Sequence, residues 1–400
     1  MPKRADAQAR RWPGGGFRAV EELSMKFVDE FRDPGVITRT AEEIRRLADP
    51  GRHYRIMEVC GGHTHAIYRF GLKDLLPSNL ELIHGPGCPV CVLPMGRIDD
   101  GLSIAQDPDV IFAAFGDMMR VPGTSGSPLE HKARGLDVRI VYSPSDALKL
   151  AQNNPGKHVM FFAIGFETTA PSTALTLMRA KALGLHNFSV FSNHVTIIPA
   201  IRAILDSPDM RIDAFIGPGH VSTVIGCRPY EWIAKNENKP VAVSGFEPLD
   251  ILQSIVMVLR QLKAGDARIE NQYKRVVPWE GNRAALRAMA EVFELRPYFE
   301  WRGLGFISQS ALRLRQGYAE WDAERRFVVP GVRVTDPRAA QCGEVLKGVL
   351  KPHQCKLFGK ECTPEHPIGA LMVSSEGSCA AYFSYEHRKT EILTSIRPAA

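Results

Sequence analysis

Short apolar runs, separated by turns rich in glycine and polar residues, fill the first two thirds of the chain. Most of the runs end in glycine or a small polar residue, and they cover residues 55–60, 80–85, 110–116, 138–142, 159–165, 188–194, 213–219 and 241–245. Stretches with a helical pattern, such as 170–183 and 197–206, lie between several of them. Apolar runs that alternate with helices are typical of parallel sheets covered on both faces. The pattern predicts an α/β fold.

The eight runs form two consecutive sets of four, with turn-forming breaks near the middle at 144–146 and 153–156. We therefore predict two similar, small parallel-sheet domains at residues 51–150 and 151–250. A flexible basic extension, residues 1–24, and a helical segment, residues 25–50, precede them. We expect that helical segment to pack on a third domain.

The pattern changes after about residue 250. Residues 248–265 read as an amphipathic helix with a proline at its start and a glycine at its end, and residues 282–295 read as another. From residue 330 onward, cysteine, glycine and proline become frequent. We predict a third, mostly helical domain at 251–400, built around something other than a large apolar core.

Composition excludes several classes of function. The net charge of +6 over 400 residues is mild, and no basic stripe follows the first dozen residues, so we expect no nucleic-acid partner. No apolar stretch approaches the length of a membrane helix, and the basic N-terminus lacks the apolar region of a secretory signal. Walker A, GxGxxG, HExxH and GxSxG motifs are absent from the sequence. We expect a cytoplasmic protein without membrane contact.

Four of the eight cysteines lie in one C-terminal stretch. Cys342, Cys355, Cys362 and Cys379 are spaced C-x12-C-x6-C-x16-C. Four thiolates in one segment suit a 4Fe–4S cluster or a structural zinc ion. Zinc sites usually contain a closer cysteine pair, so the spacing favours the cluster, with zinc and inert buried thiols as the alternatives.

A second set of cysteines follows two of the apolar runs. Cys60 begins the motif "CGGHTH", and Cys88 and Cys91 belong to "GPGCPVC". Cys60 and His63 together could ligate a transition metal, and a hydrogen-bonding role within the loop explains the histidine equally well. The Cys88–Cys91 pair is consistent with a redox dithiol, with metal binding or with a turn carrying inert thiols. Cys227 is isolated, and a small buried apolar role suits it best.

Polar residues also follow several of the predicted strands. They include Glu167, Thr168 and Thr169 of "GFETTAP", together with Asp117, Arg120, His194, His220 and Glu247. Any one of them is explained by helix capping or backbone hydrogen bonding. Because the carboxyl ends of parallel strands meet at one rim, the set as a whole indicates a site or a partner surface.

Six motifs together resemble the hydrogenase maturation factor HypD family. They are "CGGHTH", "GPGCPVC", "FGDMMRVPG", "GFETTAPS", "SGFEPLDIL" and "CTPEHPIGALMVSSEGSCAAYF", and the likeness runs from about residue 25 to 388. Leu371 is a departure, because relatives often carry an additional cysteine there. The four-cysteine spacing survives without it.

The resemblance implies a three-domain iron–sulfur protein that is a redox-active assembly factor rather than a free-standing enzyme, and that is a monomer on its own. With a small HypC-type chaperone it would be the scaffold for the Fe(CN)2CO unit of nickel–iron hydrogenase. A HypE-type partner would donate cyanide.

The resemblance also implies a role for each motif. Cys60 would hold the iron together with the chaperone's N-terminal cysteine, with His63 beside it. Cys88 and Cys91 would be the redox dithiol. The loop of Glu167, Thr168 and Thr169 would contact a partner or take part in cyanide transfer. The quartet that would bind the 4Fe–4S cluster is Cys342, Cys355, Cys362 and Cys379.

Two other functions compete with the scaffold. One is a cluster-dependent thiol–disulfide oxidoreductase, and the other is a zinc-stabilised binding module. A brown colour of the anaerobic protein would separate a cluster from zinc, and the fate of a Cys60 variant would separate the scaffold from the oxidoreductase.

Overall fold

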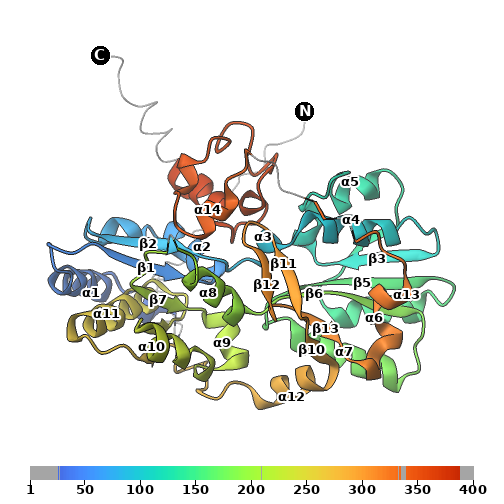
Figure 1. The fold of residues 1–400 in the computed structure, drawn as a ribbon, viewed down its shortest axis with the longest axis horizontal. Coiled ribbons are helices and arrows are strands. Elements are labelled where there is room, and N and C mark those ends of the chain that lie inside the picture. The colour runs from blue at the N-terminus through green and yellow to red at the C-terminus, as the bar shows by residue number, and fades with distance from the viewer. Residues whose placement is uncertain (1–25, 27, 209, 332, 335–338, 388–400) are drawn as a thin grey trace, which may run out of the picture.

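The computed structural model describes residues 26, 28–208, 210–331, 333, 334 and 339–387 of the chain (Figure 1). The basic extension predicted for residues 1–24 lies outside the described residues.

A five-stranded parallel sheet forms one half of the molecule. Its order is β2-β1-β7-β8-β9, from Leu80–His84, Tyr54–Glu58, Ala214–Gly217, Val241–Val243 and Ile269–Asn271. β1 and β2 pair along their whole length, so that Glu58 stands opposite His84. This register brings two polar side chains together at the carboxyl ends of neighbouring strands.

A four-stranded parallel sheet forms the other half. Its order is β4-β3-β5-β6, from Val138–Ile140, Val110–Ala114, His158–Gly165 and Phe188–His194. Every residue of β3 and β6 is buried, as expected for strands covered on both faces. All eight predicted strands form, and the predicted α/β class with two parallel sheets is confirmed.

The strands do not divide between the sheets near residue 150 as the sequence predicted. The chain makes β1 and β2, crosses to build β3–β6, and then returns for β7–β9. The break at residue 144 is the start of α6 (Pro144–Asn153), which joins β4 to β5 within one sheet, and the Ser143 side chain accepts a hydrogen bond from Asp146 N. Turn residues report a local change of direction, not which sheet the next strand joins.

The predicted helices form close to their expected bounds. α7 is Ala170–Ala182, α8 is Ile197–Leu205, and α11 is Pro248–Ala264 with Gly265 after it at φ 68°. α11 lies on β7 and β8 and packs against α1 (Pro34–Leu47). The N-terminal helix therefore does pack on a helix from the range 251–400, as predicted, but that helix belongs to the layer over the five-stranded sheet and not to a separate third domain.

Residues 265–315 contain more strand than the sequence indicated. β9 completes the five-stranded sheet, and two short antiparallel pairs follow. β10 (Phe293–Leu295) pairs with β13 (Leu312–Leu314), and β11 (Tyr298–Trp301) pairs with β12 (Gly305–Ser308). α12 (Arg283–Val292) precedes them and packs on α7. The sequence did not predict these strands, because three or four residues are too few to show the alternation of apolar and polar side chains that marks a strand.

The C-terminal segment, residues 339–387, lies over the junction between the two halves (Figure 1). Its helices include α14 (Cys342–Leu346) and α15 (Ser378–Tyr382). α15 packs against α2 (Gly61–Arg69), and the 3₁₀ helix Ala370–Met372 packs against α3 (Pro89–Val92). This packing brings the C-terminal cysteines to the loops that carry Cys60, Cys88 and Cys91. Across the described residues, no helix combines the length and apolarity needed to cross a bilayer.

Candidate functional site

A cleft of about 420 Å³ opens where strand ends of the two sheets meet the C-terminal segment. The five-stranded sheet contributes Cys60 and His220, and the other sheet contributes Asp117 and Thr169. Glu376, from the C-terminal segment, also lines the cleft. The polar loop residues grouped from the sequence are therefore divided. Asp117, Thr168, Thr169 and His220 line this cavity, and the residues that do not are Arg120, Glu167, His194 and Glu247.

Cys60 stands directly before α2, at its N-cap position. Its backbone N–H donates to Glu58 Oε2 at 2.9 Å, and its Sγ lies 3.8 Å from His220 Nδ1. Burial, and then the nearby carboxylates of Glu376 and Glu58, raise the pKa of the thiol to about 12. Without a bound metal ion, Cys60 is therefore a thiol at neutral pH. A metal ion that binds the sulfur would displace the proton to a base.

Glu58 holds the Cys60 loop through its hydrogen bond with the Cys60 amide. It is fully buried, and its other oxygen accepts hydrogen bonds from His84 Nδ1 at 2.8 Å and from the Thr64 hydroxyl. A buried carboxylate is tolerated where several donors satisfy it. Here three donors do so, and one of them is the Cys60 amide.

His63 is buried behind the cleft rather than exposed in it. Its Nε2 lies 3.2 Å and 3.0 Å from the carbonyl oxygens of Ser244 and Gly245, and burial lowers its pKa. The Phe246 ring stacks against His63 and His220, with ring centroids 4.7 Å and 4.0 Å away. His63 Nδ1 is buried without a hydrogen-bond partner, so it is the atom of this residue that remains available as a donor to a metal. The structure places His220, which the sequence marked only weakly, against the Cys60 thiol.

Cys88 and Cys91 lie between Cys60 and the C-terminal segment. Gly87 sits against the Cys60 loop so closely that a β-carbon there would be 2.5 Å from Cys60 Cα. Both thiols are buried, at 3% and 1% exposure, and both are free. Burial, with the hydrogen bond and charge of Cys88, raises the pKa of Cys91. The two thiols are thus enclosed by the protein and close enough to hydrogen-bond to each other.

The four C-terminal cysteines line one small cavity of about 20 Å³, together with apolar residues that include Leu371 and Met372. The amide of Gly369 donates to Cys362 Sγ at 3.3 Å. Burial and the neighbouring cysteines raise the pKa of Cys379. Four thiols that converge on one apolar cavity have the donor chemistry of an iron–sulfur site. As the side chains stand, no group of three or more His, Cys, Asp or Glu residues in the described part of the chain is arranged to hold a metal ion.

The "GFETTAP" loop is divided between two cavities. Thr168 and Thr169 line the Cys60 cleft, whereas Glu167 lines a separate cavity of about 540 Å³. Glu167 Oε1 accepts a hydrogen bond from Ile197 N at 3.0 Å, and its Oε2 is buried without a partner. Burial raises the pKa of Glu167 to about 7. Glu167 therefore holds the start of α8 and does not face Cys60.

Sequence reasoning missed Glu58, His84 and Glu376. Glu58 carried a usable signal, because a charged residue inside the apolar run "RIMEVC" must find partners when the strand is buried. Glu376 carried no signal, since an acidic residue in a glycine–serine loop is ordinary. Its position beside Cys60 depends on how the C-terminal segment folds back. Cys227 is buried with a free thiol, as expected for a small apolar residue.

Comparison with known proteins gives consistent matches over most of the chain. The sequence model of HypD, described as "Hydrogenase formation hypA family", matches residues 35–386. The Rhodobacter capsulatus protein named hydrogenase maturation factor HypD is 57% identical over 370 residues, which are 90% of this chain and 98% of that protein. The protein of the same name from Escherichia coli (strain K12) is 55% identical over 372 residues, 92% of this chain and 100% of that protein. Hydrogenase maturation factor HypD2 of Bradyrhizobium diazoefficiens is 54% identical over 368 residues, 90% of this chain and 97% of that protein.

Proposed function

The chain belongs to the HypD family of hydrogenase maturation factors, and from that premise we propose that it is the scaffold on which the Fe(CN)2CO unit of nickel–iron hydrogenase is assembled. A HypC-type chaperone docks over the cleft, and a HypE-type partner brings cyanide as a thiocyanate. The iron and its ligands are cargo that enters and leaves.

This proposal rests on the position of residues 376–379, which pass close to all three groups of cysteines. Glu376 lines the cleft beside Cys60, a β-carbon on Gly377 would lie 3.0 Å from Cys91 Sγ, and Cys379 lines the cavity of the quartet. One four-residue stretch therefore touches the iron anchor, the dithiol and the cluster site. Such a layout suits chemistry in which electrons and an iron-bound group meet at one place.

Cys60 is the protein's anchor for the iron, with His63 Nδ1, from the first turn of α2, as a second donor. Binding of a cation deprotonates a thiol even when burial has raised its pKa. The His220 imidazole, 3.8 Å from the sulfur, is placed to accept the proton. Soft thiolate ligands suit an iron that carries strong-field ligands.

The dithiol supplies the electrons that release cyanide. A thiocyanate and the two thiols of Cys88 and Cys91 give a free thiol on the partner, hydrogen cyanide and a disulfide. The S–CN bond breaks, an S–S bond forms, and two electrons and two protons pass to the products. Cyanide binds the iron once its proton is lost.

The quartet is the place for a resident 4Fe–4S cluster, because its four thiols surround one apolar cavity. When bound, such a cluster would supply single electrons, two of which, with two protons, would return the disulfide to the dithiol. This redox cycle requires free thiols, so we infer a reducing, cytoplasmic location.

A stand-alone thiol–disulfide oxidoreductase is less well supported. Such a protein must offer its dithiol to a disulfide on another protein. Here both thiols are almost completely buried.

The test is anaerobic co-purification with a HypC-type chaperone after co-expression of the maturation proteins, followed by infrared spectroscopy. The wild-type complex should show CN and CO stretching bands. Cys60→Ala should lose both bands while the brown colour of the quartet remains, and the matched variant Cys227→Ala should keep both. Bands that persist in Cys60→Ala would overturn the assignment of the anchor.

A further inference from the structure

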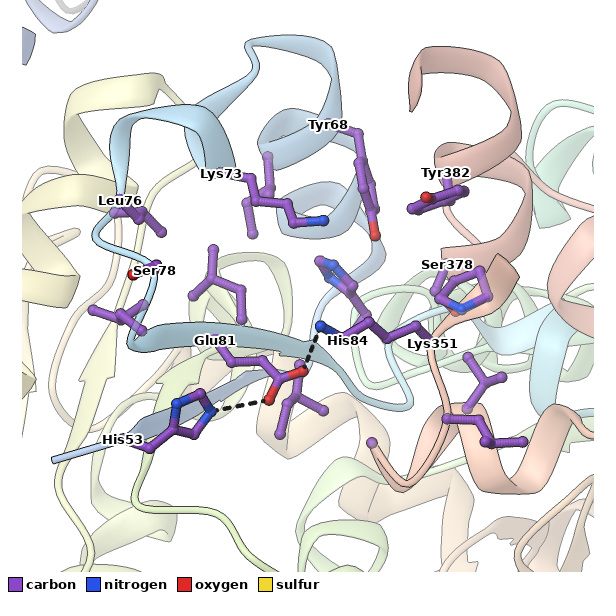
Figure 2. A pocket seen from close by; sticks show the side chains of 18 of the residues that line it. His53, Tyr68, Lys73, Leu76, Ser78, Glu81, His84, Lys351, Ser378 and Tyr382 are labelled. Carbon is purple, nitrogen blue, oxygen red and sulfur yellow. Dashed lines mark hydrogen bonds and ion pairs between the residues drawn. The ribbon is translucent and has the colours of Figure 1, made fainter. Parts of the chain in front are cut away.

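A further cavity, apart from the three already described, is lined by His84, the hydrogen-bond partner of Glu58. It has a volume of about 220 Å³ and lies between β2 and the C-terminal segment (Figure 2). All five residues of β2, the edge strand of the five-stranded sheet, line it. Val345, Gly348 and Lys351 close the opposite side. No step of the proposed scaffold chemistry uses this space.

The inner wall of the cavity is rich in hydrogen-bond donors. Ser378 is 4% exposed, and its hydroxyl is buried without a hydrogen-bond partner. Tyr68 and Tyr382 flank it, with their hydroxyl groups at the cavity (Figure 2). Burial raises the pKa of both phenols, so both carry a proton to donate at neutral pH. An unpaired buried hydroxyl is costly unless a ligand or water completes its bonding.

The mouth of the cavity carries excess positive charge. Lys73 and Lys351 line it, and Glu81 is the single carboxylate among the lining residues. The Glu81 carboxylate is paired with Lys351 at 3.1 Å and with His53 at 3.3 Å (Figure 2), and also with Arg55 at 3.4 Å. Lys73 has no carboxylate partner among the described residues, and its Nζ lies 5.9 Å from the centre of the Tyr382 ring.

We propose that this cavity is a binding site for a small oxyanion, a phosphate or carboxylate group. The ammonium groups of Lys73 and Lys351 attract the anion at the mouth, and the hydroxyls of Ser378, Tyr68 and Tyr382 bond its oxygens inside. Charged acceptors form the stronger hydrogen bonds with such donors, whereas a cationic ligand would meet two ammonium groups. The proposal is independent of the scaffold function.

An anion bound in this cavity would contact residues that adjoin both thiol centres. His84 forms part of the wall and donates to Glu58, which holds the Cys60 amide. Ser378 directly precedes Cys379 of the quartet. An anion bound to Ser378 is therefore next to Cys379 of the quartet. An anion beside His84 is linked to the Cys60 amide through the hydrogen bonds of Glu58.

The test is calorimetric titration of the anaerobically purified full chain with sodium phosphate and, separately, with sodium acetate. We expect saturable one-site binding of at least one of the two anions. The double variant Lys73→Met, Lys351→Met should raise the Kd by roughly tenfold or more, since it removes two charge-assisted contacts. Ser378→Ala should weaken binding several-fold without changing the charge. Lys149→Met should leave the Kd unchanged, because Lys149 is an exposed lysine of α6 in the other half of the molecule.

A thermal unfolding series provides a second measurement that does not depend on heats of binding. A ligand that binds only the native state raises the unfolding midpoint, and the rise grows with the logarithm of the ligand concentration above the Kd. The midpoint of the wild type should rise with the anion that binds, and that of the double variant should not. Failure of both anions to bind the wild type, or binding that the double variant and Ser378→Ala leave unchanged, would overturn the proposal.

Discussion

The two thiol centres of this protein are built in opposite ways. The quartet is drawn from one stretch of chain, residues 342–379, and surrounds a small cavity with apolar walls. The Cys60 cleft is about twenty times larger, draws on both sheets and the C-terminal segment, and carries Asp117, His220 and Glu376 on its walls. The enclosed site suits a group that stays, and the open, polar site suits a cargo that comes and goes.

The contrast also shows what each centre depends on. A metal centre closed by local ligands contributes to the folding of its own segment, because the ligands order together with the metal. A cleft between two sheets is held by the sheets and by buried polar contacts such as those of Glu58. Damage to the quartet should therefore appear as lost stability, and damage to the cleft should appear mainly as altered chemistry at Cys60.

The largest effect is expected from Cys362→Ala. Loss of one ligand should bleach the protein and lower the stability of residues 339–387, by an amount on the order of 10 kcal/mol if the cluster matters as much as a structural zinc ion does. Visible absorbance and anaerobic limited proteolysis would measure both. Cys227→Ala, which removes a buried thiol outside both centres, should keep the colour and cost about 1 kcal/mol. A colourless Cys362→Ala protein that stays fully protease-resistant would break the comparison, because the quartet would then be dispensable for folding.

An intermediate effect is expected from Glu58→Gln. The amide cannot accept from all three donors, and its NH2 group would face either the Cys60 amide or His84. The free energy of unfolding should fall by about 1–3 kcal/mol, with the brown colour kept. Glu43→Gln, which removes an exposed ion pair with Arg260, should cost no more than about 1 kcal/mol in the same anaerobic thermal unfolding experiment. Equal losses in the two variants would mean that Glu58 does not support the cleft.

The smallest effect on stability and the sharpest on chemistry is expected from Glu376→Gln. A carboxylate beside a thiol disfavours the thiolate, and Glu376 is the larger of the two carboxylate contributions that raise the pKa of Cys60 to about 12. Its removal should lower that pKa, so that at mildly alkaline pH more Cys60 is thiolate and iodoacetamide reacts several-fold faster. Mass spectrometry of the tryptic peptide 56–69, in which Cys60 is the only cysteine, measures the rate.

The exposed Glu361 of the quartet segment provides the matched control for this experiment. Glu361→Gln should leave the alkylation rate of Cys60 unchanged. A rate that stays the same or falls in Glu376→Gln would show that Glu376 does not govern the ionisation of the cleft thiol.

Two features could not be predicted from the sequence. They are which sheet each strand joins and which cavity each residue of the "GFETTAP" loop lines. Each apolar run identified a buried strand, yet nothing in β7 or β8 distinguishes a partner of β1 from a partner of β6. In the same way, neighbours in "GFETTAP" enter different cavities, because Glu167 turns to bond Ile197 N while Thr169 faces the cleft. A motif marks residues that matter, but the backbone path decides what each side chain touches.

The sequence by itself determined the local properties of this protein. Runs of apolar residues encode burial and helical or strand geometry within a few residues, and so the α/β class, the helices at 170–182 and 248–264 and the closely spaced thiols of Cys88 and Cys91 were readable. Only the tertiary structure decided that β3–β6 form a sheet of their own, that Glu58 meets His84 across the β1–β2 register, and that residues 376–379 join three sulfur sites. Parallel strand pairing and loop convergence join residues far apart in the chain. Their free energy depends on all the partners at once, so no local pattern specifies them.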